Sequence, residues 1–307
     1  MSTTRTAAVV LNYRTPAETI AAVTSLRESS RACDIIVVDN HSGDGSEERL
    51  RAALPDVVLV QTGRNLGYSG GNNVGIRAAL TRGADMVFIV NSDVTVPPHC
   101  VARLEAALSA DPQLGLAGPV ILTRSSPPRV DSIGMAFSVH TGRMRHPRHG
   151  TRFDARMVPP VREVDGLMGC AVLVKRAVFA QVGLLAEEYF FSMEDLDFCL
   201  RARARGFASA CIGTASVLHG GSVSVGRQSP ARIYYGTRNH LLLASRLPRV
   251  PRPLRWVRTV SIMALNLAYV LRQSDVPRLQ AIRALNRGVR DHLAGRYGPG
   301  LPHPGGR

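Results

Sequence analysis

Three polar side chains follow short apolar runs and could contact a ligand there. Asn12, Asp39 and Asp93 come after runs that are typical of strands buried on both faces. The carboxyl ends of parallel strands meet at one edge of a sheet, where ligands bind in open α/β folds. A carboxylate held there can bind a hard metal ion, and the metal can hold a diphosphate. The alternative for Asn91-Ser92-Asp93 is a plain turn, because Asn, Ser and Asp are common turn residues.

A second group of candidate residues opens a predicted helix that runs to about residue 205. Glu194, Asp195 and Asp197 directly follow the aromatic residues of 189–191. Acids in a first helical turn are stabilised by the helix dipole, and this is the structural alternative. Three acids in four positions exceed what capping needs. A nearby Glu194 would raise the pKa of Asp195, which suits a general base.

The segment 63–75 is rich in glycine and asparagine, and its later part opens a helix that reaches about residue 81. Its glycines lack the G-x-G-x-x-G spacing of dehydrogenases, and the chain contains no Walker P-loop. A sugar nucleotidylyltransferase would carry a basic, glycine-rich loop after the first strand, and residues 12–16 do not form one. These three enzyme classes are therefore disfavoured.

The order of the elements predicts an α/β fold with a mostly parallel sheet flanked by helices. The predicted strands are 7–11, 34–38, 57–60, 86–90, 116–122, 169–174 and, as the last one, 208–212, after which 217–219 leads into a loop. The predicted helices are 15–29, 47–53, one that opens in the later part of 63–75 and reaches about 81, 97–108, 176–182, 194–205 and one from 233 onward. Thr15 and Glu18 have the spacing of a capping box. The segment 124–160 shows little periodicity and is expected to form a loop or hairpin over the sheet. We expect one domain over 1–245 and a basic, helical C-terminal extension over 246–307, ending in a disordered tail at 302–307.

The net charge of +15 is concentrated in the last third of the chain. From residue 201 onward there are 18 arginines, no lysine and two acids, Asp275 and Asp291, so the first 200 residues are almost neutral. This asymmetry indicates an anionic partner such as a membrane surface, a phosphorylated lipid or a nucleic acid. A compositional bias would explain arginine in place of lysine, but not the missing acids. Nucleic acid is disfavoured, because aromatic residues are only 5 % and no RNA- or DNA-binding motif is present.

The apolar run within 256–271 leaves two alternatives open. Its uninterrupted part is about 13 residues, which is too short to span a bilayer. It could lie in a membrane interface, or it could pack on the domain. Five scattered cysteines favour a reducing compartment, and the short apolar run near the N-terminus is no signal peptide. We therefore expect a cytoplasmic protein, with contact to the inner face of the membrane as an open alternative.

Six motifs in order resemble the family 2 glycosyltransferases of GT-A fold, and among them the branch of the bacterial rhamnosyltransferases. The resemblance covers about residues 7 to 245, and the six together are specific although each alone is weak. The motifs are Val-Val-Leu-Asn-Tyr (9–13), Ile-Val-Val-Asp-Asn-His-Ser-Gly-Asp-Gly-Ser (36–46), Asn-Leu-Gly-Tyr-Ser-Gly-Gly-Asn-Asn-Val-Gly (65–75), Asn-Ser-Asp (91–93), Met-Glu-Asp-Leu-Asp-Phe-Cys-Leu-Arg (193–201) with His219, and Tyr-Tyr-Gly-Thr-Arg-Asn (234–239).

The resemblance implies a role for each matching residue. Asp195 would be the catalytic base, and Glu194 would contact or orient the acceptor. Asp93 and His219 would bind Mg²⁺ or Mn²⁺, although Asn91 replaces the first Asp of the family's Asp-x-Asp motif. The expected donor-binding residues are Asn12, Asp39, Arg64, Asn65, Gly70, Asn73, Asn91, Ser92 and Asp93, and the expected acceptor or phosphate contacts are Asp197, Arg238 and Asn239.

The resemblance also implies the reaction. An inverting hexosyltransferase would move a sugar, rhamnose being favoured, from a dTDP- or UDP-linked donor to an acceptor hydroxyl. The acceptor would be a glycan or a lipid-diphosphate sugar in cell-wall polysaccharide or glycolipid synthesis. Two alternatives stay open: a soluble natural product as acceptor, and a non-catalytic protein that binds anions or nucleic acid through its arginine-rich last third.

Overall fold

The computed structural model describes residues 4–221, 229–247, 251–272 and 276–300, so the predicted tail at 302–307 lies outside the described residues. The first half of the chain alternates strands and helices. Its elements are β1 (Thr6–Asn12), α1 (Pro16–Arg27), β2 (Asp34–Asp39), α2 (Ser46–Ala53), β3 (Val58–Gln61), α3 (Gly67–Thr81), β4 (Met86–Asn91), β5 (Val94–Thr95), α4 (Cys100–Ala110) and β6 (Leu114–Thr123).

The second half adds short strands and then long helices. Its elements are β7 (Val130–Ser132), β8 (Ala136–Phe137), β9 (Met144–Arg145), the 3-10 helix η1 (Ala155–Met157), β10 (Arg162–Val164), β11 (Ala171–Lys175), α5 (Arg176–Val182), the 3-10 helix η2 (Glu187–Tyr189), α6 (Glu194–Arg203), β12 (Ala208–His219), α7 (Pro230–Arg246), α8 (Arg252–Arg272) and α9 (Arg278–Leu293).

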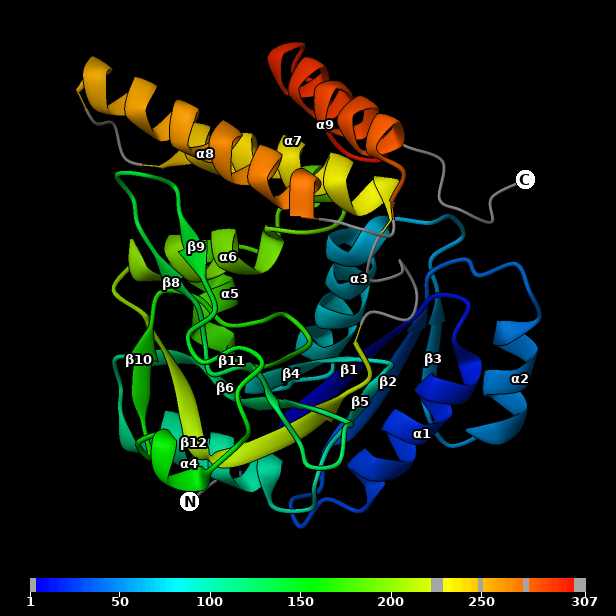
Figure 1. Cartoon of the computed structure of the whole chain (residues 1–307). Helices are drawn as coiled ribbons and strands as arrows, with labels where there is room; N and C mark the ends of the chain where they lie inside the picture. Colours follow the sequence, from blue (N-terminus) through cyan, green and yellow to red (C-terminus); the bar gives the residue numbers. More distant parts are fainter. Residues whose placement is uncertain (1–3, 222–228, 248–250, 273–275, 301–307) are drawn as a thin grey trace.

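One twisted sheet organises the molecule (Figure 1). Its strand order is β10-β12-β6-β11-β4-β1-β2-β3, with β5 paired to β12 and β7 paired to β6. Strands β4, β1, β2 and β3 are parallel, β6 and β12 are parallel, and β11 joins the two groups in antiparallel pairing. The predicted α/β fold with a mostly parallel sheet is confirmed.

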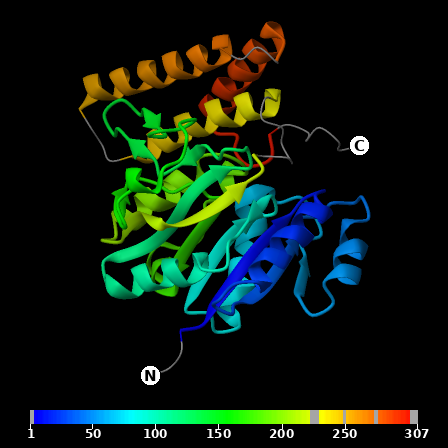
Figure 2. The same ribbon diagram turned by 60° about the horizontal axis from the view of Figure 1, so that its bottom comes forward.

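Helices cover both faces of the sheet, as Figure 2 shows. Helices α1, α2 and α4 contribute to one apolar core, and α3, α5 and α6 contribute to the other. Within β1, Ala8 and Val10 belong to the first core, whereas Ala7 and Val9 belong to the second. This two-sided burial explains why the strands read as continuous apolar runs.

Some predicted elements differ from the structure. The runs 208–212 and 217–219 are one strand, β12, because a register shift between Ile212 and Ser216 carries the strand past the polar residues between them. The segment 124–160 holds β7, a β8–β9 hairpin and η1. The capping box at Thr15 is wrong, because its side chain makes no cap bond and its hydroxyl instead lies 3.0 Å from that of Ser92.

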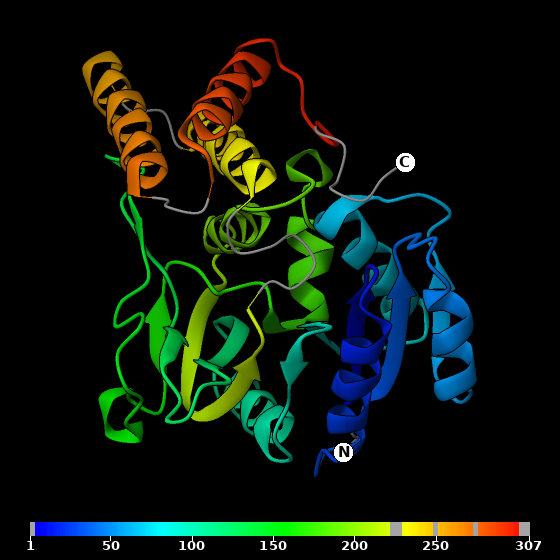
Figure 3. The same ribbon diagram turned by 45° about the vertical axis from the view of Figure 1, so that its right-hand side comes forward.

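Helices α7, α8 and α9 stack on the domain on the side away from the sheet (Figures 1 and 3). Among the described residues, α8 is the one helix that is long and apolar enough to cross a membrane by length and composition. It is longer than the apolar run in the sequence because arginine-containing turns extend it at both ends. A buried core helix would pass the same test, but only 17 % of the apolar stretch of α8 is buried.

Gly75 sets how closely α3 approaches the sheet, and this gives a prediction about stability. A Cβ atom there would lie 2.3 Å from Cγ1 of Val9 and 2.9 Å from Cγ2 of Val38. We expect Gly75→Ala to lower the free energy of unfolding by about 1–3 kcal/mol through overpacking. Gly236→Ala is the matched control in another helix, where a Cβ would meet nothing within 4 Å. It should be neutral or stabilise by about 1 kcal/mol. Urea denaturation measures both, and an unchanged Gly75→Ala would contradict the close approach.

Candidate active site

Asn12 and Asp39 meet at the carboxyl ends of β1 and β2, as predicted. The Nδ2 of Asn12 donates to Oδ1 of Asp39 at 2.6 Å, and both side chains are buried. Thr19 donates to Oδ1 of Asn12 at 2.7 Å, and Gln61 donates to Oδ2 of Asp39 at 2.8 Å. Four elements thus fix the Asp39 carboxylate at the edge of the sheet.

The glycine-rich segment lies beside this edge and starts α3. Oδ1 of Asn65 accepts hydrogen bonds from Nδ2 of Asn40 at 3.1 Å and from the backbone N–H of Gly67 at 2.8 Å. The side chain of Arg64 is exposed, whereas Gly70 is buried. These bonds fix the backbone of the segment, and Arg64 is left at its surface.

The structure gives Asn73 a position inside the protein. It is buried, its Nδ2 donates to the carbonyl of Leu185 at 2.8 Å and to Oε1 of Glu187 at 2.9 Å, and its Oδ1 accepts from the N–H of Leu185. Asn73 therefore ties α3 to the segment before α6. A sugar-nucleotide donor could contact the side chain of Asn73 directly only if it replaced these hydrogen bonds.

The triplet 91–93 ends β4 next to β12. The hydroxyl of Ser92 lies 3.0 Å from that of Thr15, which links the triplet to the start of α1. Asn91 remains in the sheet, where its N–H donates to the carbonyl of Cys170. Asp93 is buried, and its Oδ1 lies 3.5 Å from Nε2 of His219. The structure therefore brings the two predicted metal ligands together.

His219 is held between two carboxylates. Its Nδ1 lies 2.9 Å from Oδ2 of Asp131, a residue that the sequence did not single out. Burial alone would raise the pKa of Asp131, but the hydrogen bond and charge of His219 lower it overall. The contact between Nδ1 and the Asp131 carboxylate leaves Nε2 of His219 facing Oδ1 of Asp93.

Nε2 of His219 could bind a metal ion only if no other group in the protein occupies it. It is buried and makes no hydrogen bond among the described residues. Nε2 of His219 and Oδ1 of Asp93 lie 3.5 Å apart, a distance that fits two ligands of one divalent cation. The described part of the chain has no group of three or more His, Cys, Asp or Glu side chains suited to a metal. Further ligands would have to come from a diphosphate or water.

Glu194 and Asp195 open α6 as predicted. Asp195 accepts hydrogen bonds from the backbone N–H groups of Gly169 at 3.0 Å and Leu196 at 2.8 Å. Burial raises the pKa of Asp195, although these bonds oppose the rise. Burial also raises the pKa of Glu194, with a further contribution from the charge of Asp195. One oxygen of Glu194 is buried without a partner among the described residues, so burial and the charge of Asp195 together favour the protonated form of Glu194.

The turn before these acids is strained. Phe190, Ser192 and Met193 all have positive φ angles, of 61°, 74° and 75°. Phe190 is the centre of a γ-turn, in which the N–H of Phe191 donates to the carbonyl of Tyr189 at 2.6 Å. Such positions cost about 1–3 kcal/mol each and persist only where the surroundings hold them.

Arg238 and Asn239 of α7 hold this turn. Nδ2 of Asn239 lies 2.7–2.9 Å from the carbonyl oxygens of Tyr189, Phe191 and Ser192. Arg238 is fully buried and donates to the carbonyls of Tyr189 and of residue 188. The structure therefore places both residues behind the turn at 189–193, where they bind its backbone carbonyls.

Asp197 also points inward. Its carboxylate pairs with Arg201 at 2.7 Å and accepts from the hydroxyl of Tyr189 at 3.0 Å. It lies in the first turn of α6, on the side away from the Gly169 contact of Asp195. Like Arg238 and Asn239, it is used within the protein, and the structure does not bring it to the acceptor side.

A cavity of about 430 Å³ lies next to the strained turn that precedes Asp195, between the hairpin segment and the C-terminal helices. Its lining includes Met193 and Ser192 from the strained turn, Met168, Asp131 and His146. Burial lowers the pKa of His146, and the charge of Asp195 opposes this, so the two groups are close enough to interact. Residues from α7 and α8 close the cavity on its far side. Its position suits an acceptor.

Sequence reasoning missed Asp131 and His146 because they lie in the segment without periodicity. One signal was present in the sequence: Asp131 is the single acid between Asp111 and Asp154, inside a strongly basic stretch. An isolated acid in such a stretch is a candidate partner for a buried cation or histidine. Its partner, His219, is 88 residues away and is brought close by the pairing of β6 with β7 and β12.

The family model described as glycosyl transferase family 2 matches residues 8–182, more than half of the chain. The chain belongs to this family. The N-acetylglucosaminyl-diphospho-decaprenol L-rhamnosyltransferase of Mycobacterium tuberculosis is 32 % identical over 248 residues, covering 74 % of this chain and 80 % of the relative. The dTDP-rhamnosyl transferase RfbF of Shigella flexneri is 26 % identical, with coverages of 77 % and 78 %.

A solved structure shows the same fold at low sequence identity. The mannosyltransferase PcManGT of Pyrobaculum calidifontis, in complex with GDP-Man and Mn²⁺, has a TM-score of 0.61 and 15 % identity over 96 % of this chain and 89 % of its own. This chain is therefore a glycosyltransferase of GT-A fold.

The protonated state of Glu194 gives a prediction about pH. Because burial raises its pKa, folding favours the protonated form, so stability falls as the pH rises from the unfolded-state value of about 4.3 toward the raised value. Glu194→Gln imitates the protonated form and should raise the melting temperature at pH 7. The gain should vanish near pH 4, where the wild type is protonated in both states.

The matched control is Glu48→Gln on the exposed side of α2, which should change the melting temperature little at either pH. Differential scanning fluorimetry across pH 4–8 measures both variants. A gain from Glu194→Gln that is equal at pH 4 and pH 7 would show that Glu194 is ionised in the folded protein.

Proposed function

We propose that this glycosyltransferase moves a rhamnosyl group from dTDP-rhamnose to a hydroxyl of a lipid-diphosphate-linked sugar, with inversion, in the synthesis of a cell-envelope polysaccharide. The observation that carries the proposal is the position of Asp195, a carboxylate of raised pKa that lies two residues after Met193, which lines the cavity of about 430 Å³. The donor and acceptor classes are supported by the two rhamnosyltransferase relatives, which match 74 % and 77 % of the chain.

The donor lies at the carboxyl edge of the sheet in this proposal. Asp39, held by Asn12 and Gln61, accepts a hydrogen bond from the N–H of the pyrimidine base. The exposed guanidinium of Arg64 offsets phosphate charge. When bound by Asp93 Oδ1 and His219 Nε2, Mg²⁺ or Mn²⁺ supplies Lewis-acid neutralisation of the diphosphate charge.

Asp195 acts as the base in a single displacement. It takes the proton of the acceptor hydroxyl as the hydroxyl oxygen forms its bond to the anomeric carbon, and the bond from that carbon to the diphosphate oxygen breaks. The nucleoside diphosphate leaves from the opposite side, which inverts the anomeric configuration. Protonated Glu194 donates a hydrogen bond and adds no second negative charge next to the base.

A lipid-linked acceptor requires contact with a membrane, and α8 supports this. Its outward side carries an apolar stripe at helical spacing, consisting of Trp256, Val260, Leu267 and Leu271, each between 46 % and 73 % exposed. The opposite side of α8, with Ile262, packs on the domain. Apolar stripes of this kind on a helix rich in arginine are typical of membrane-interface helices.

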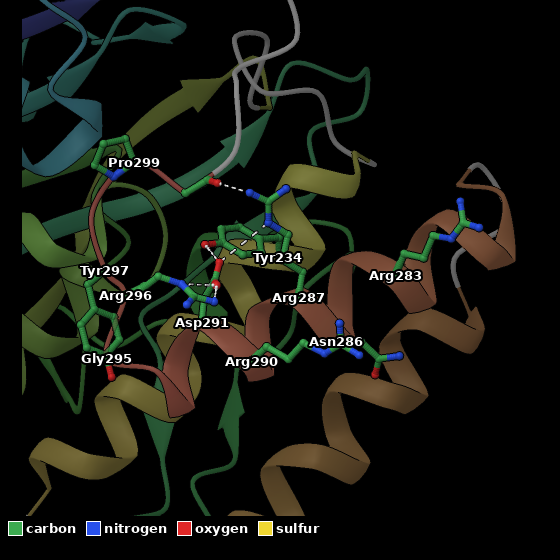
Figure 4. A pocket seen from close by; sticks show the side chains of 11 residues that line it. Tyr234, Arg283, Asn286, Arg287, Arg290, Asp291, Gly295, Arg296, Tyr297 and Pro299 are labelled. Carbon is green, nitrogen blue, oxygen red and sulfur yellow. Dashed lines mark hydrogen bonds and ion pairs between the residues drawn. The ribbon is translucent and has the colours of Figure 1, made fainter.

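The arginines of α9 supply charge for an anionic surface (Figure 4). Arg283, Arg287, Arg290 and Arg296 line a cavity of about 950 Å³ whose single carboxylate is Asp291. Arg296 and Arg287 lie within 4 Å of this carboxylate, whereas Arg283 and Arg290 have no ion pair among the described residues. The cavity is therefore net positive, and positive surfaces attract anionic lipids.

The alternative of a soluble natural-product acceptor would leave the apolar stripe of α8 without a partner. A protein with a soluble acceptor would also gain nothing from a positive surface beside that stripe. The lipid-linked acceptor is favoured for this reason. Membrane binding distinguishes the lipid-linked acceptor from the soluble acceptor, and the Val260→Asp variant described below tests it.

The proposed role of Asp195 as the catalytic base can be tested by substitution. Asp195→Asn should lower kcat by about 10²–10⁴-fold. Donor binding should stay nearly unchanged, because Asp195 lies on the acceptor side. Thermal shift with dTDP-, UDP- and GDP-sugars, with and without Mn²⁺, measures donor binding, and dTDP-rhamnose should stabilise most. Asp56→Asn, at an exposed ion pair with Arg27, is the control and should leave both quantities unchanged.

Comparable transfer by Asp195→Asn would remove the base assignment. Stronger stabilisation by a UDP- or GDP-sugar would contradict the proposed donor while leaving the base untested by that measurement alone. The two outcomes come from separate assays, so each part of the proposal is judged on its own.

The proposed contact of α8 with a membrane can also be tested by substitution. Val260→Asp should reduce binding to anionic vesicles about tenfold. The substitution removes a valine side chain that the membrane would bury, and it adds a negative charge that anionic lipids repel. Val161→Asp is the matched control, since Val161 is 55 % exposed at the opposite part of the molecule and Val260 is 62 % exposed. Vesicle flotation at low salt measures both. A wild-type protein that stays off phosphatidylglycerol vesicles would overturn the membrane contact.

A further inference from the structure

Arg258 is a buried cation without a counter-charge. It lies on the inner side of α8 and is only 3 % exposed. Its Nη1 donates to the carbonyl oxygen of Ala244 at 3.1 Å, but Nε and Nη2 are buried and have no hydrogen-bond partner among the described residues. Burial lowers the pKa of this guanidinium. An unpaired buried charge is strongly destabilising, so its presence indicates an anion that the protein binds there.

Arg258 lines a groove of about 720 Å³ between α7, α8 and α9. Arg255 and Thr259, one turn or less away on the same helix, lie on the same wall and add a second guanidinium and a hydroxyl. Ser245 and His292 add further polar atoms, and no acid is among the described residues of the lining. The polar part of this groove therefore has the composition of a phosphate site, which uses arginine and hydroxyl donors.

The rest of the groove is apolar. Leu241, Leu247, Met263, Val289 and Leu293 come from all three helices and line it. Leu293 is 79 % exposed, so the apolar lining reaches the surface of the protein. A site for a free phosphate or a soluble nucleotide would not need this lining. A hydrocarbon chain attached to the phosphate would bury it.

We propose that this groove binds a membrane lipid, with its phosphate at Arg258 and its hydrocarbon chain along the apolar lining. The site is distinct from the cavity next to the strained turn that precedes Asp195, with which it shares no lining residue. The lipid would reach it from the membrane that contacts the apolar stripe of α8, and in this respect the inference rests on the proposed membrane contact. The lipid then supplies the counter-charge that Arg258 lacks.

The experiment separates the anion from the chain and uses the full-length protein without donor, acceptor or vesicles. Octyl phosphate, octyl glucoside and inorganic phosphate are compared in thermal shift at equal concentrations, below micelle formation. Octyl phosphate should raise the melting temperature by about 3 °C at about ten times its Kd. Octyl glucoside has the chain without the charge, and inorganic phosphate has the charge without the chain. Each should shift it by less than about 1 °C.

Arg258→Met keeps the length of the side chain and removes its charge. It should lose the octyl phosphate shift, and without ligand it should melt at or above the temperature of the wild type, because the unpaired charge is gone. Arg272→Met, at the exposed end of the same helix, is the control and should keep the shift. Leu293→Glu changes an exposed residue of the lining and should reduce the shift at least twofold without affecting folding.

Three results would overturn the proposal. An equal shift by octyl glucoside would mean an apolar groove that does not recognise phosphate. An equal shift by inorganic phosphate would mean an anion site without a lipid chain. An undiminished octyl phosphate shift in Arg258→Met or Leu293→Glu would place the binding elsewhere, for example at the arginines of α9. Because no vesicle or sugar is present, none of these results depends on the transfer reaction or on docking of α8.

Discussion

The backbone turn at 189–193 is the constraint on which the site depends, because it joins three helices. The carbonyl of Phe190 accepts from the N–H of Tyr68 at 2.6 Å, which ties the turn to the start of α3. A Cβ on Gly67 would lie 2.4 Å from that same carbonyl oxygen, so only glycine permits the approach. The hydrogen bonds of Asn239 hold the other side. The start of α3, the turn before α6 and helix α7 are therefore positioned together, although they are far apart in the sequence.

The polar groups of the candidate site differ in how well they are paired. Asn12 and Asp39 bond to each other and to their neighbours, which gives a rigid surface at the edge of the sheet. Single buried polar atoms of Glu194, His146 and His219, and also of Ser69 and Asn72 in α3, lack hydrogen bonds among the described residues. Unpaired buried atoms are costly, and native structures keep them mainly where a ligand, ion or proton transfer uses them.

The sequence was sufficient for the fold and for the residues at strand ends, because both follow from local patterns. Apolar runs ending in Asn12, Asp39 and Asp93 place these residues at one edge, and acids at a helix start place Asp195. Sequence reasoning was insufficient where a role depends on partners distant in the chain. Arg238 and Asn239 are polar residues in a helix, and nothing local shows that they point inward to carbonyl groups. Asp131 meets His219 only through the pairing of β6 with β7 and β12.

The arginine-rich last third is likewise not one uniform surface. Arg201 pairs with Asp197 and Arg246 with Glu188, so part of the excess charge is used inside the domain to hold the segments around η2 and α6. Nε and Nη2 of Arg258 are buried without a hydrogen-bond partner among the described residues, whereas the arginines of α9 and Arg296 line an open cavity. The scarcity of acids in the last third of the chain also matters for Arg258. An acid near Arg258 would neutralise it internally, and the groove would then have no electrostatic reason to bind an anion.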